Sequence, residues 1–432
     1  MIRDAMLAAG TVLSAASTLR LPGLPLGAGE VLLALWLALS GTHLIATGRI
    51  DAGLAFRRMG TFWCVFALSL GIGAFLGMLF DPIVEGASMA HDAMAYVLMA
   101  TISCLALILP DNAVRMRRSA WFLVGFANVG LAFQLALGFG LVPAGGIDPW
   151  YWNRFRGWSE NPNQAALYCA VFSAVAIHLG MTAQSRGARV AGWMGAVLPL
   201  VAGRLTRSDT FLLTMLGLFG LLGALRLKTW LDDPAGGVRR TAAMAILVAA
   251  PLVLASLLPF VWSERTDASA LALSLAKDHG GDATMQTANL RLELWRSAIR
   301  KGLESASFGF GPGPHLERPN VPRLATLPRP FEAHSTILDL FLQGGIIAVG
   351  IFAWLHVSTL RLLFRARLDA LAALVCAVII FGISHFILRH PILWFGLVLC
   401  LAEGCARLPA MQARLASTSR AGMGQGGRLC AA

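Results

Sequence analysis

Charged residues are scarce in this 432-residue chain: Asp, Glu, Lys and Arg together make up 13% of it, whereas 57% of the residues are hydrophobic. With a mean hydropathy of +0.68, the chain lacks the polar surface that a soluble globular protein needs. Long apolar runs recur instead, each near the ~20 residues that a helix needs to cross a bilayer. We count twelve such runs, at 5–19, 25–47, 61–80, 88–109, 119–142, 163–183, 190–203, 209–226, 241–262, 335–360, 369–388 and 391–407.

The alternation of polar and apolar residues that marks a barrel strand is missing from these runs. A bilayer offers the backbone no hydrogen-bond partners, so the spans must be helices. The sequence therefore predicts an all-α fold, a polytopic membrane helical bundle of about twelve transmembrane helices. The chain divides into 1–262 with transmembrane helices 1–9, a large loop at 263–332 that contains helices, 333–408 with helices 10–12, and a disordered tail at 409–432.

Lysine is almost absent, with 3 residues against 32 arginines, and the net charge is +12. In a soluble protein this balance would suggest a nucleic-acid partner. Here the basic residues gather in alternate connections, as the positive-inside rule requires. We therefore expect no nucleic acid, both termini in the cytoplasm, and a periplasmic 263–332 loop. The basic residues of the cytoplasmic connections are Arg49, Arg57, Arg58, Arg115, Arg117, Arg118, Arg186, Arg189, Arg226, Lys228, Arg239, Arg240, Arg361, Arg365 and Arg367.

Cysteine is confined to the spans and the tail, so we expect neither disulfides nor a thiolate metal site. The outer connections also lack the Asp-x-Asp, His-Glu-x-x-His, phosphate-loop and Cys/His motifs. No metal, nucleotide or other cofactor is therefore indicated. His91 and His315 are interpreted as surface histidines.

The 263–332 loop contains one convincing helix, at 285–303. At 100° per residue, apolar side chains form a broad arc, and Arg291 falls near its middle. A buried unpaired guanidinium is costly, so Arg291 must find an anion or an acid. Arg296 and Arg300 lie on the opposite, solvated face.

His334 stands where the chain re-enters the membrane, after a Gly- and Pro-rich segment at 307–335. Ser335 and Thr336 are natural helix caps, and a helix N-terminus disfavours a protonated imidazole. A neutral histidine is what a general base requires. Ser335, Asp339 and Gln343 then form a polar stripe that must face the bundle interior. The alternative is a histidine that marks the headgroup level.

Three other outer connections carry candidates. Residues 145–164 place Trp150, Tyr151, Trp152 and Trp158 around Arg154 and Arg156, which suits sugar rings and phosphates or, alternatively, an aromatic belt. Asn161 and Asn163 begin the next helix. Arg204 and Arg207 lie close to lipid, where a charge needs a partner. His385 and Arg389 share a helix face near the last outer turn.

Together these groups indicate a chemistry. Guanidinium groups stabilise a pyrophosphate leaving group, and a neutral histidine can deprotonate an attacking hydroxyl. We expect glycan transfer from a lipid pyrophosphate, with inversion at the anomeric carbon. A lipid-linked glycan flippase or transporter is the alternative; it would show polar residues at the bilayer midplane and two related halves.

Five segments carry a family resemblance: RGWSENPNQAAL (156–167), LTRSDTFLL (205–213), NLRLELWRSAI (289–299), FGFGPG (308–313) and EAHSTILDLFLQGG (332–345). In this order they resemble the bacterial O-antigen ligase and polysaccharide polymerase superfamily. The resemblance implies an integral-membrane C-type glycosyltransferase of the inner membrane with a periplasmic site. It also implies an undecaprenyl-pyrophosphate glycan donor, a glycan or lipid A core acceptor, and a metal-independent reaction.

Carried over by position, the resemblance implies His334 as catalytic base, with Arg207 and Arg291 on the donor phosphates. Thr206 and Ser335 depart from the serine and asparagine usual at these positions. Ligase and polymerase are not separated by these motifs. The further side chains that we expect to bind substrate are Arg154, Arg156, Asn161, Asn163, Arg204, Glu332, Asp339, His385 and Arg389.

Overall fold

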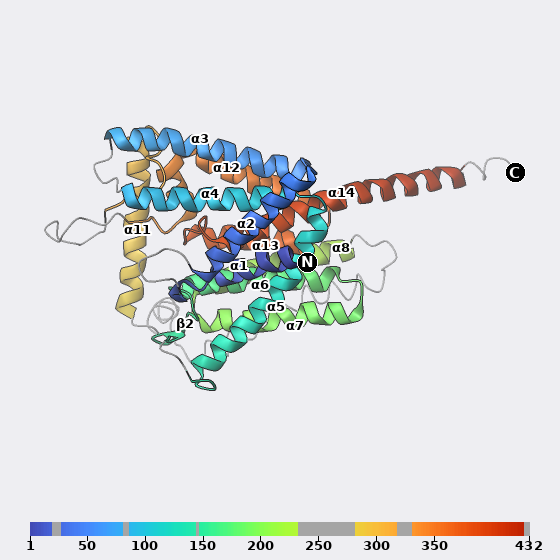
Figure 1. Cartoon of the computed structure of the whole chain (residues 1–432), viewed down its shortest axis with the longest axis horizontal. Coiled ribbons are helices and arrows are strands. Elements are labelled where there is room, and N and C mark those ends of the chain that lie inside the picture. Colours follow the sequence, from blue (N-terminus) through green and yellow to red (C-terminus); the bar gives the residue numbers. More distant parts are fainter. Residues whose placement is uncertain (20–26, 81–85, 144–146, 232–280, 318–330, 427–432) are drawn as a thin grey trace.

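The computed structural model describes residues 1–19, 27–80, 86–143, 147–231, 281–317 and 331–426. Within them the chain folds into twelve α-helices, most of them side by side along one axis (Figure 1). The helices are α1 (Ile2–Leu13), α2 (Ala28–Thr47), α3 (Leu54–Phe80), α4 (Gly86–Ile108), α5 (Asn112–Gly138), α6 (Pro162–Thr182), α7 (Arg186–Leu205), α8 (Asp209–Leu231), α11 (Gly281–Glu304), α12 (Thr336–Arg365), α13 (Asp369–Ile383) and α14 (Pro391–Gly426). A short 3-10 turn covers Ser17–Leu19.

Eight of the described helices are long and apolar enough to cross a membrane: α2 to α6, α8, α12 and the first part of α14. Helix α13 is apolar but shorter. Helices α1 and α7 also fall on predicted apolar runs. The ninth predicted run, 241–262, lies outside the described residues, as do 263–280 and 318–330 of the predicted loop. The helical membrane bundle is thus confirmed, whereas the number of twelve spans and the full loop stay predictions.

Two very short strands, β1 (Trp150–Tyr151) and β2 (Arg154–Phe155), pair antiparallel between α5 and α6. The all-α prediction is therefore right for the bundle and misses this hairpin. Its inner face packs on the bundle, because Phe155 is fully buried and contacts Trp150 with ring centroids 5.6 Å apart. The hairpin carries Arg154 to the edge of the site described below.

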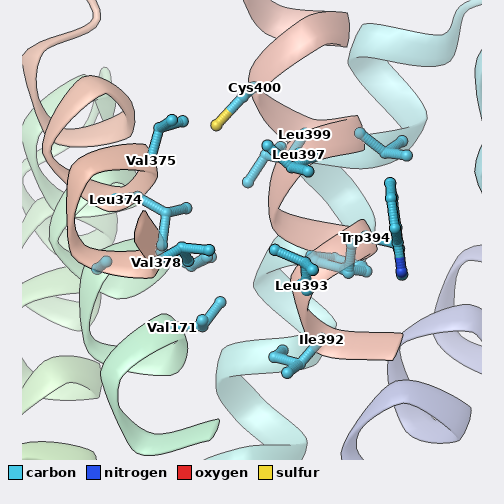
Figure 2. Close-up of a cluster of buried hydrophobic side chains, with 14 of the residues drawn as sticks. Val171, Leu374, Val375, Val378, Ile392, Leu393, Trp394, Leu397, Leu399 and Cys400 are labelled. Carbon is cyan, nitrogen blue, oxygen red and sulfur yellow. The ribbon is translucent and has the colours of Figure 1, made fainter. Parts of the chain in front are cut away.

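The core is centred on α6, of which 89% of the most apolar stretch is buried. Its Val171 side chain faces Leu374 and Val378 of α13 and Leu393 of α14 (Figure 2). Helix α6 is buried on all its sides rather than along one stripe, as expected for a helix surrounded by others.

Helix α11 runs across the end of the bundle, nearly at right angles to the other helices (Figure 1). Leu294 and Ala298 are buried against Leu342 of α12 and Ala333 before it. The buried arc is narrower than predicted, because Leu292 and Ile299 are each 49% exposed. Packing on α12 requires only the strip that faces its first turns.

Helix α12 is interrupted at Gly345, whose φ of 64° and ψ of −158° are not helical. The carbonyls left free on the N-terminal side are occupied: Phe310 N donates to Leu342 O at 2.7 Å, and Gly311 N donates to Gln343 O at 2.8 Å. Ile346 N donates to Ser307 O at 2.9 Å. The Gly344–Gly345 pair, which permits close packing or a break, thus marks a break, and the Gly-rich segment supplies the hydrogen bonds that lipid cannot.

Helix α14 continues to Gly426 and projects beyond the bundle (Figure 1). The sequence predicts disorder from residue 409, and the backbone up to Gly426 is helical instead. Residues 410–416 (AMQARLA) are strong helix formers, which the prediction, based on the tail's Gly and Ser content, underweighted.

Candidate functional site

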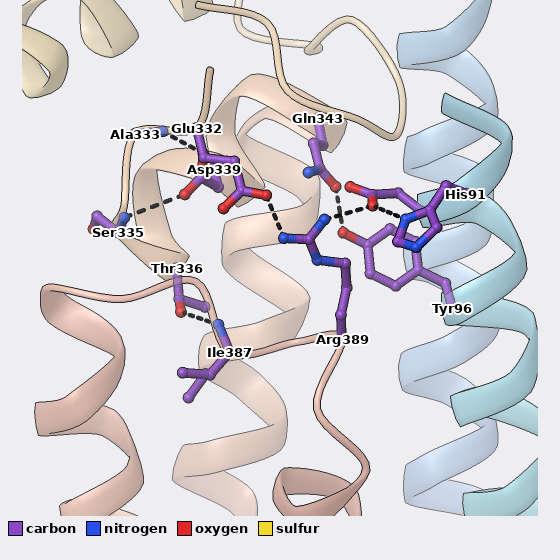
Figure 3. Close-up of polar contacts among 11 residues, drawn as sticks. His91, Tyr96, Glu332, Ala333, Ser335, Thr336, Asp339, Gln343, Ile387 and Arg389 are labelled. Carbon is purple, nitrogen blue, oxygen red and sulfur yellow. Dashed lines mark hydrogen bonds and ion pairs between the residues drawn. The ribbon is translucent and has the colours of Figure 1, made fainter. Parts of the chain in front are cut away.

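His334 lies in the short turn that leads into α12, and its backbone is left-handed, with a φ of 52°. The carboxylate of Asp339 fixes this turn (Figure 3). Its Oδ1 accepts from Ala333 N at 2.7 Å, and its Oδ2 accepts from Ser335 N at 3.2 Å. Asp339 is 2% exposed. Asp339, which the sequence predicts to bind substrate, holds with its carboxylate the peptide groups on both sides of His334.

Ser335 is the N-cap residue of α12 but makes no side-chain cap hydrogen bond. Thr336 Oγ1 donates instead to His385 O at 2.6 Å and accepts from Ile387 N at 3.2 Å. Ser335 and Thr336 therefore do not cap the helix with their side chains as predicted. Thr336, two residues after His334, thus ties the start of α12 to the connection between α13 and α14 at Ile387 (Figure 3) and at His385.

The His334 side chain lines a cavity of about 520 Å³ at the same end of the bundle. Its polar wall comes from the ends of several helices. The polar residues that line it are Ser14, Glu30, His91, Glu160, Asn161, Asn163, Gln164, Glu332, His334, His385, Arg389 and His390. Of the residues expected to bind substrate, the cavity thus brings together Asn161, Asn163, Glu332, His385 and Arg389.

Burial lowers the pKa of the His334 imidazole below its usual value; the Glu332 carboxylate acts in the opposite sense, and Arg291 and Arg389 lower it further. The imidazole is therefore neutral at neutral pH. The sequence predicts this state from the helix N-terminus, whereas the largest cause in the structure is loss of solvent.

Arg291 is half-buried, whereas Arg296 and Arg300 are exposed, as the helical arc predicts. Burial lowers the pKa of Arg291, and the Asp209 carboxylate raises it. The charge of Arg291 lowers the pKa of both His334 and His385.

Arg154 joins the same group. Its Nε donates to Thr206 O at 3.0 Å, and its Nη2 donates to Asn163 Oδ1 at 3.1 Å. Burial lowers the pKa of Arg154, the Asp209 carboxylate raises it, and Arg291 lowers it. The bond to Thr206 connects the hairpin to the turn that carries Arg207.

Arg204 and Arg207 are exposed, and Arg207 is left-handed with a φ of 49°. The Arg207 backbone N–H donates to Arg204 O at 3.1 Å, which closes the turn between α7 and α8. Ser208 begins α8, its Oγ accepting from Phe211 N at 3.4 Å. Arg156 braces the hairpin instead: its Cζ lies 5.7 Å from the Tyr151 ring centroid, and its Nε and Nη2 donate to Asp148 O.

Arg389 is engaged with two carboxylates, at 2.8 Å from Asp92 of α4 and in direct contact with Glu332 (Figure 3). Burial lowers its pKa, but Glu332 and Asp92 raise it by more, so the guanidinium stays charged. His385 and Arg389 lie in the connection between α13 and α14 and not on a helix face, which corrects that prediction.

Several residues at the site were not predicted from the sequence. His91 is half-exposed, in agreement with its interpretation as a surface histidine, and it also lines the cavity. Tyr96 OH donates to Gln343 Oε1 at 2.6 Å beneath it. The available signal was the run of polar residues at the start of α4, His91, Asp92 and Tyr96. His315 is corrected: it is 2% exposed, and its Nε2 lies 2.8 Å from Gly311 O.

Among the residues that the structure describes, no three His, Cys, Asp or Glu side chains are grouped as metal ligands would be. No curated protein matches the chain. Residues 194–353 match a family model described as O-antigen ligase, a range that covers the turn with Arg207, helix α11 with Arg291, and His334. The apolar helices indicate a membrane protein, and this match supports its membership of the O-antigen ligase family.

Proposed function

We propose that the chain is a membrane glycosyltransferase that moves a glycan from an undecaprenyl-pyrophosphate carrier to a sugar hydroxyl. The observation that carries this proposal is the site's arrangement. A neutral imidazole, His334, lines a sizeable cavity, and two half-buried guanidinium groups, Arg154 and Arg291, lie close enough to act on the cavity's histidines.

The reaction that these groups support is a single displacement. His334 takes the proton of the acceptor hydroxyl, whose oxygen bonds to the anomeric carbon while the bond to the pyrophosphate oxygen breaks. Arg291 and Arg154, with Arg207 beside them, stabilise the charge that develops on the departing pyrophosphate. The anomeric centre is inverted, and His334 later returns its proton to water. The reaction needs no metal in this proposal.

The orientation follows from charge. Basic residues lie at the helix ends opposite the site, for example Arg115 in the first turn of α5, Arg186 at the start of α7 and Arg365 at the end of α12. By the positive-inside rule that end faces the cytoplasm. The site then faces the periplasm of a bacterial inner membrane, within reach of a lipid-linked glycan and a lipid A core or glycan acceptor.

Family membership favours the transferase over the flippase or transporter, and no observation in the described residues favours transport. Ligase and polymerase share the donor and differ in acceptor. Deletion of the gene in its host distinguishes them: a ligase loss leaves the polymer on the carrier lipid, whereas a polymerase loss leaves single repeats on the acceptor.

The deletion strain also tests the residues. His334→Ala should abolish glycan transfer at normal membrane abundance, because the hydroxyl has lost its base.

Arg291→Lys should reduce transfer more than Arg296→Lys, since the first side chain is half-buried at the site and the second is exposed. The readout is surface glycan by gel and immunoblot. Full activity of His334→Ala would remove the histidine from the mechanism, and equal effects of the two lysine variants would remove Arg291.

A further inference from the structure

The cavity lined by His334 is poor in available positive charge. Carboxylates of Glu30, Glu160 and Glu332 line it, together with amides and four imidazoles. Arg389 is the one guanidinium among its described lining residues, and it is already engaged with Asp92 and Glu332. A phosphate or carboxylate placed here would face acids without a cation to neutralise it.

The region that contains the guanidinium groups of Arg154 and Arg291 is separate from the cavity but adjacent to it. Neither Arg154 nor Arg291 lines the cavity, although both charges act on His385 inside it. Asn163 stands between the two regions, since it lines the cavity and its Oδ1 accepts from Arg154 Nη2 at 3.1 Å. His334 thus lines a cation-poor cavity, and the region of Arg154 adjoins this cavity at Asn163.

One wall of the cavity is apolar. It is built from Ala34 of α2, Ala95 and Leu98 of α4, and Leu167 of α6. Met94 belongs to the same wall and is 61% exposed on the outside of the bundle. The cavity therefore combines polar helix ends with an apolar wall that reaches the surface of the bundle at Met94, an arrangement that suits an amphiphilic ligand.

His385 provides a specific polar contact in this cavity. Its Nε2 is buried and, among the described residues, without a hydrogen-bond partner. The ring lies 4.9 Å from that of Phe381, and the His385 carbonyl is tied to Thr336. Burial, then Arg291 and His334, lowers the pKa of His385 to about 3, so its ring stays neutral. A neutral imidazole with one unused nitrogen suits a hydroxyl group.

We propose that this cavity is the acceptor subsite and that it selects an uncharged, hydroxyl-bearing sugar joined to an apolar group, with His385 as one of its binding residues. The inference rests on the proposed function and adds the chemical class of the acceptor. A displacement with inversion requires the attacking hydroxyl and the departing pyrophosphate on opposite sides of the anomeric carbon. In this assignment the acceptor occupies the cavity, and the departing pyrophosphate binds at Arg154 and Arg291.

A matched pair of probes tests the charge selection. Hexyl β-glucoside and hexyl β-glucuronide differ only in a CH₂OH against a carboxylate. Full-length protein in nanodiscs is supplied with membrane extract of the deletion strain, which contains donor and acceptor, and glycan transfer is measured. The glucoside should inhibit transfer at a concentration at least tenfold below that of the glucuronide. Equal inhibition, stronger inhibition by the glucuronide, or inhibition by neither would overturn the inference.

Two pairs of variants test whether the discrimination between the probes arises in the cavity. Glu160→Gln removes a cavity carboxylate and should narrow the difference between the probes several-fold, whereas Glu293→Gln on the exposed face of α11 should not change it. His385→Phe keeps the ring and removes its nitrogens, so it should weaken glucoside inhibition, and His385→Gln should restore part of it. Absence of any transfer by the wild-type protein would instead defeat the proposed function. Transfer without discrimination between the probes defeats only the acceptor assignment.

Discussion

At the scale of single residues, the backbone of His334 is the informative feature. A non-glycine residue in the left-handed region costs of the order of 1–2 kcal/mol, so something must hold it there. The two bonds from Ala333 N and Ser335 N to Asp339 do so, and the burial of Asp339 excludes competing water. Asp339 is therefore a positioning residue for the proposed base.

Asp339→Asn should lower kcat by about 10- to 100-fold, as expected when a supporting group is lost, with little change in acceptor KM. The amide keeps one acceptor oxygen and loses the other. Asp111→Asn, at an exposed position, is the control and should leave kcat unchanged.

The pH dependence separates positioning from general destabilisation. Because the pKa of His334 is lowered, wild-type transfer should stay constant from neutral pH to below the usual histidine value and fall only when the imidazole is protonated. If Asp339→Asn frees the turn, His334 gains solvent, its pKa rises, and the acid limb moves to higher pH. An unshifted profile with normal kcat would show that Asp339 does not position the base.

Sequence reasoning reached part of this site. Patterns within one helix were sufficient for the buried stripe of Ser335, Asp339 and Gln343 and for the cap by Asn161, which accepts from Gln164 N. Contacts between residues far apart in the chain could not be predicted from the sequence. The pair of Arg389 and Asp92 joins residues 297 positions apart, and nothing local to either residue indicates the other.

At the scale of elements, the break in α12 fixes where its first turns point. Gly345 adopts a conformation reserved for glycine, and a Cβ there would lie 2.0 Å from Ser307 O. Helix α3 also approaches this segment closely: a Cβ on Gly73 would lie 2.3 Å from Gln343 O. The turn with His334 thus depends on a junction that is about three helical turns away.

Gly345→Ala should destabilise the protein by at least about 1–3 kcal/mol, because the backbone strain adds to the clash with Ser307, and it should strongly reduce transfer. Gly350→Ala is the matched control in the same helix, where no atom lies within 4 Å of the added Cβ. It should be neutral or stabilising by up to about 1 kcal/mol, from helix propensity. Thermal unfolding in detergent measures both; equal stability of the two variants would contradict the assignment of the break.

The Gly–Gly pair and the Gly-rich 308–313 segment were both visible in the sequence, but their pairing was not. The exposed Leu292 and Ile299 show the same limit for α11. Periodicity gives the direction of an apolar face, whereas its buried width depends on the partner helix.

At the scale of the whole molecule, a second polar cluster lies at the end opposite the site. Glu403 of α14 is 3.0 Å from His178 Nε2 of α6 and 3.2 Å from Arg117 Nη1 of α5. Arg117 also donates to the Thr182 carbonyl at 3.0 Å. Three helices are thereby joined at their cytoplasmic ends in the proposed orientation.

Glu403→Gln should destabilise the bundle by about 3–5 kcal/mol, the cost of leaving a buried partner without its counter-charge. Asp369→Asn is the control at the same end, because its partner Arg226 lies 3.6 Å away and is 54% exposed. That change should cost at most about 1 kcal/mol. Unfolding measures the difference, and acceptor KM should be unchanged in both. An effect of Glu403→Gln no larger than the control would show that the cluster does not hold the helices.

Charge distribution and span length were sufficient to predict the membrane class and the helix sequence along the chain. They could not indicate this cluster, nor that the cavity draws on the ends of α1, α2, α4, α6, α12 and α14, since both depend on how distant helices pack.

The interruption of α12 also has a consequence for biogenesis. The carbonyls of Leu342 and Gln343 are satisfied by Phe310 and Gly311, which precede them in synthesis. In the proposed orientation, the segment around residue 310 lies on the periplasmic side, so these carbonyls gain their partners only once that segment has crossed the membrane. We therefore expect insertion of this span and export of the polar stretch before it to be completed together.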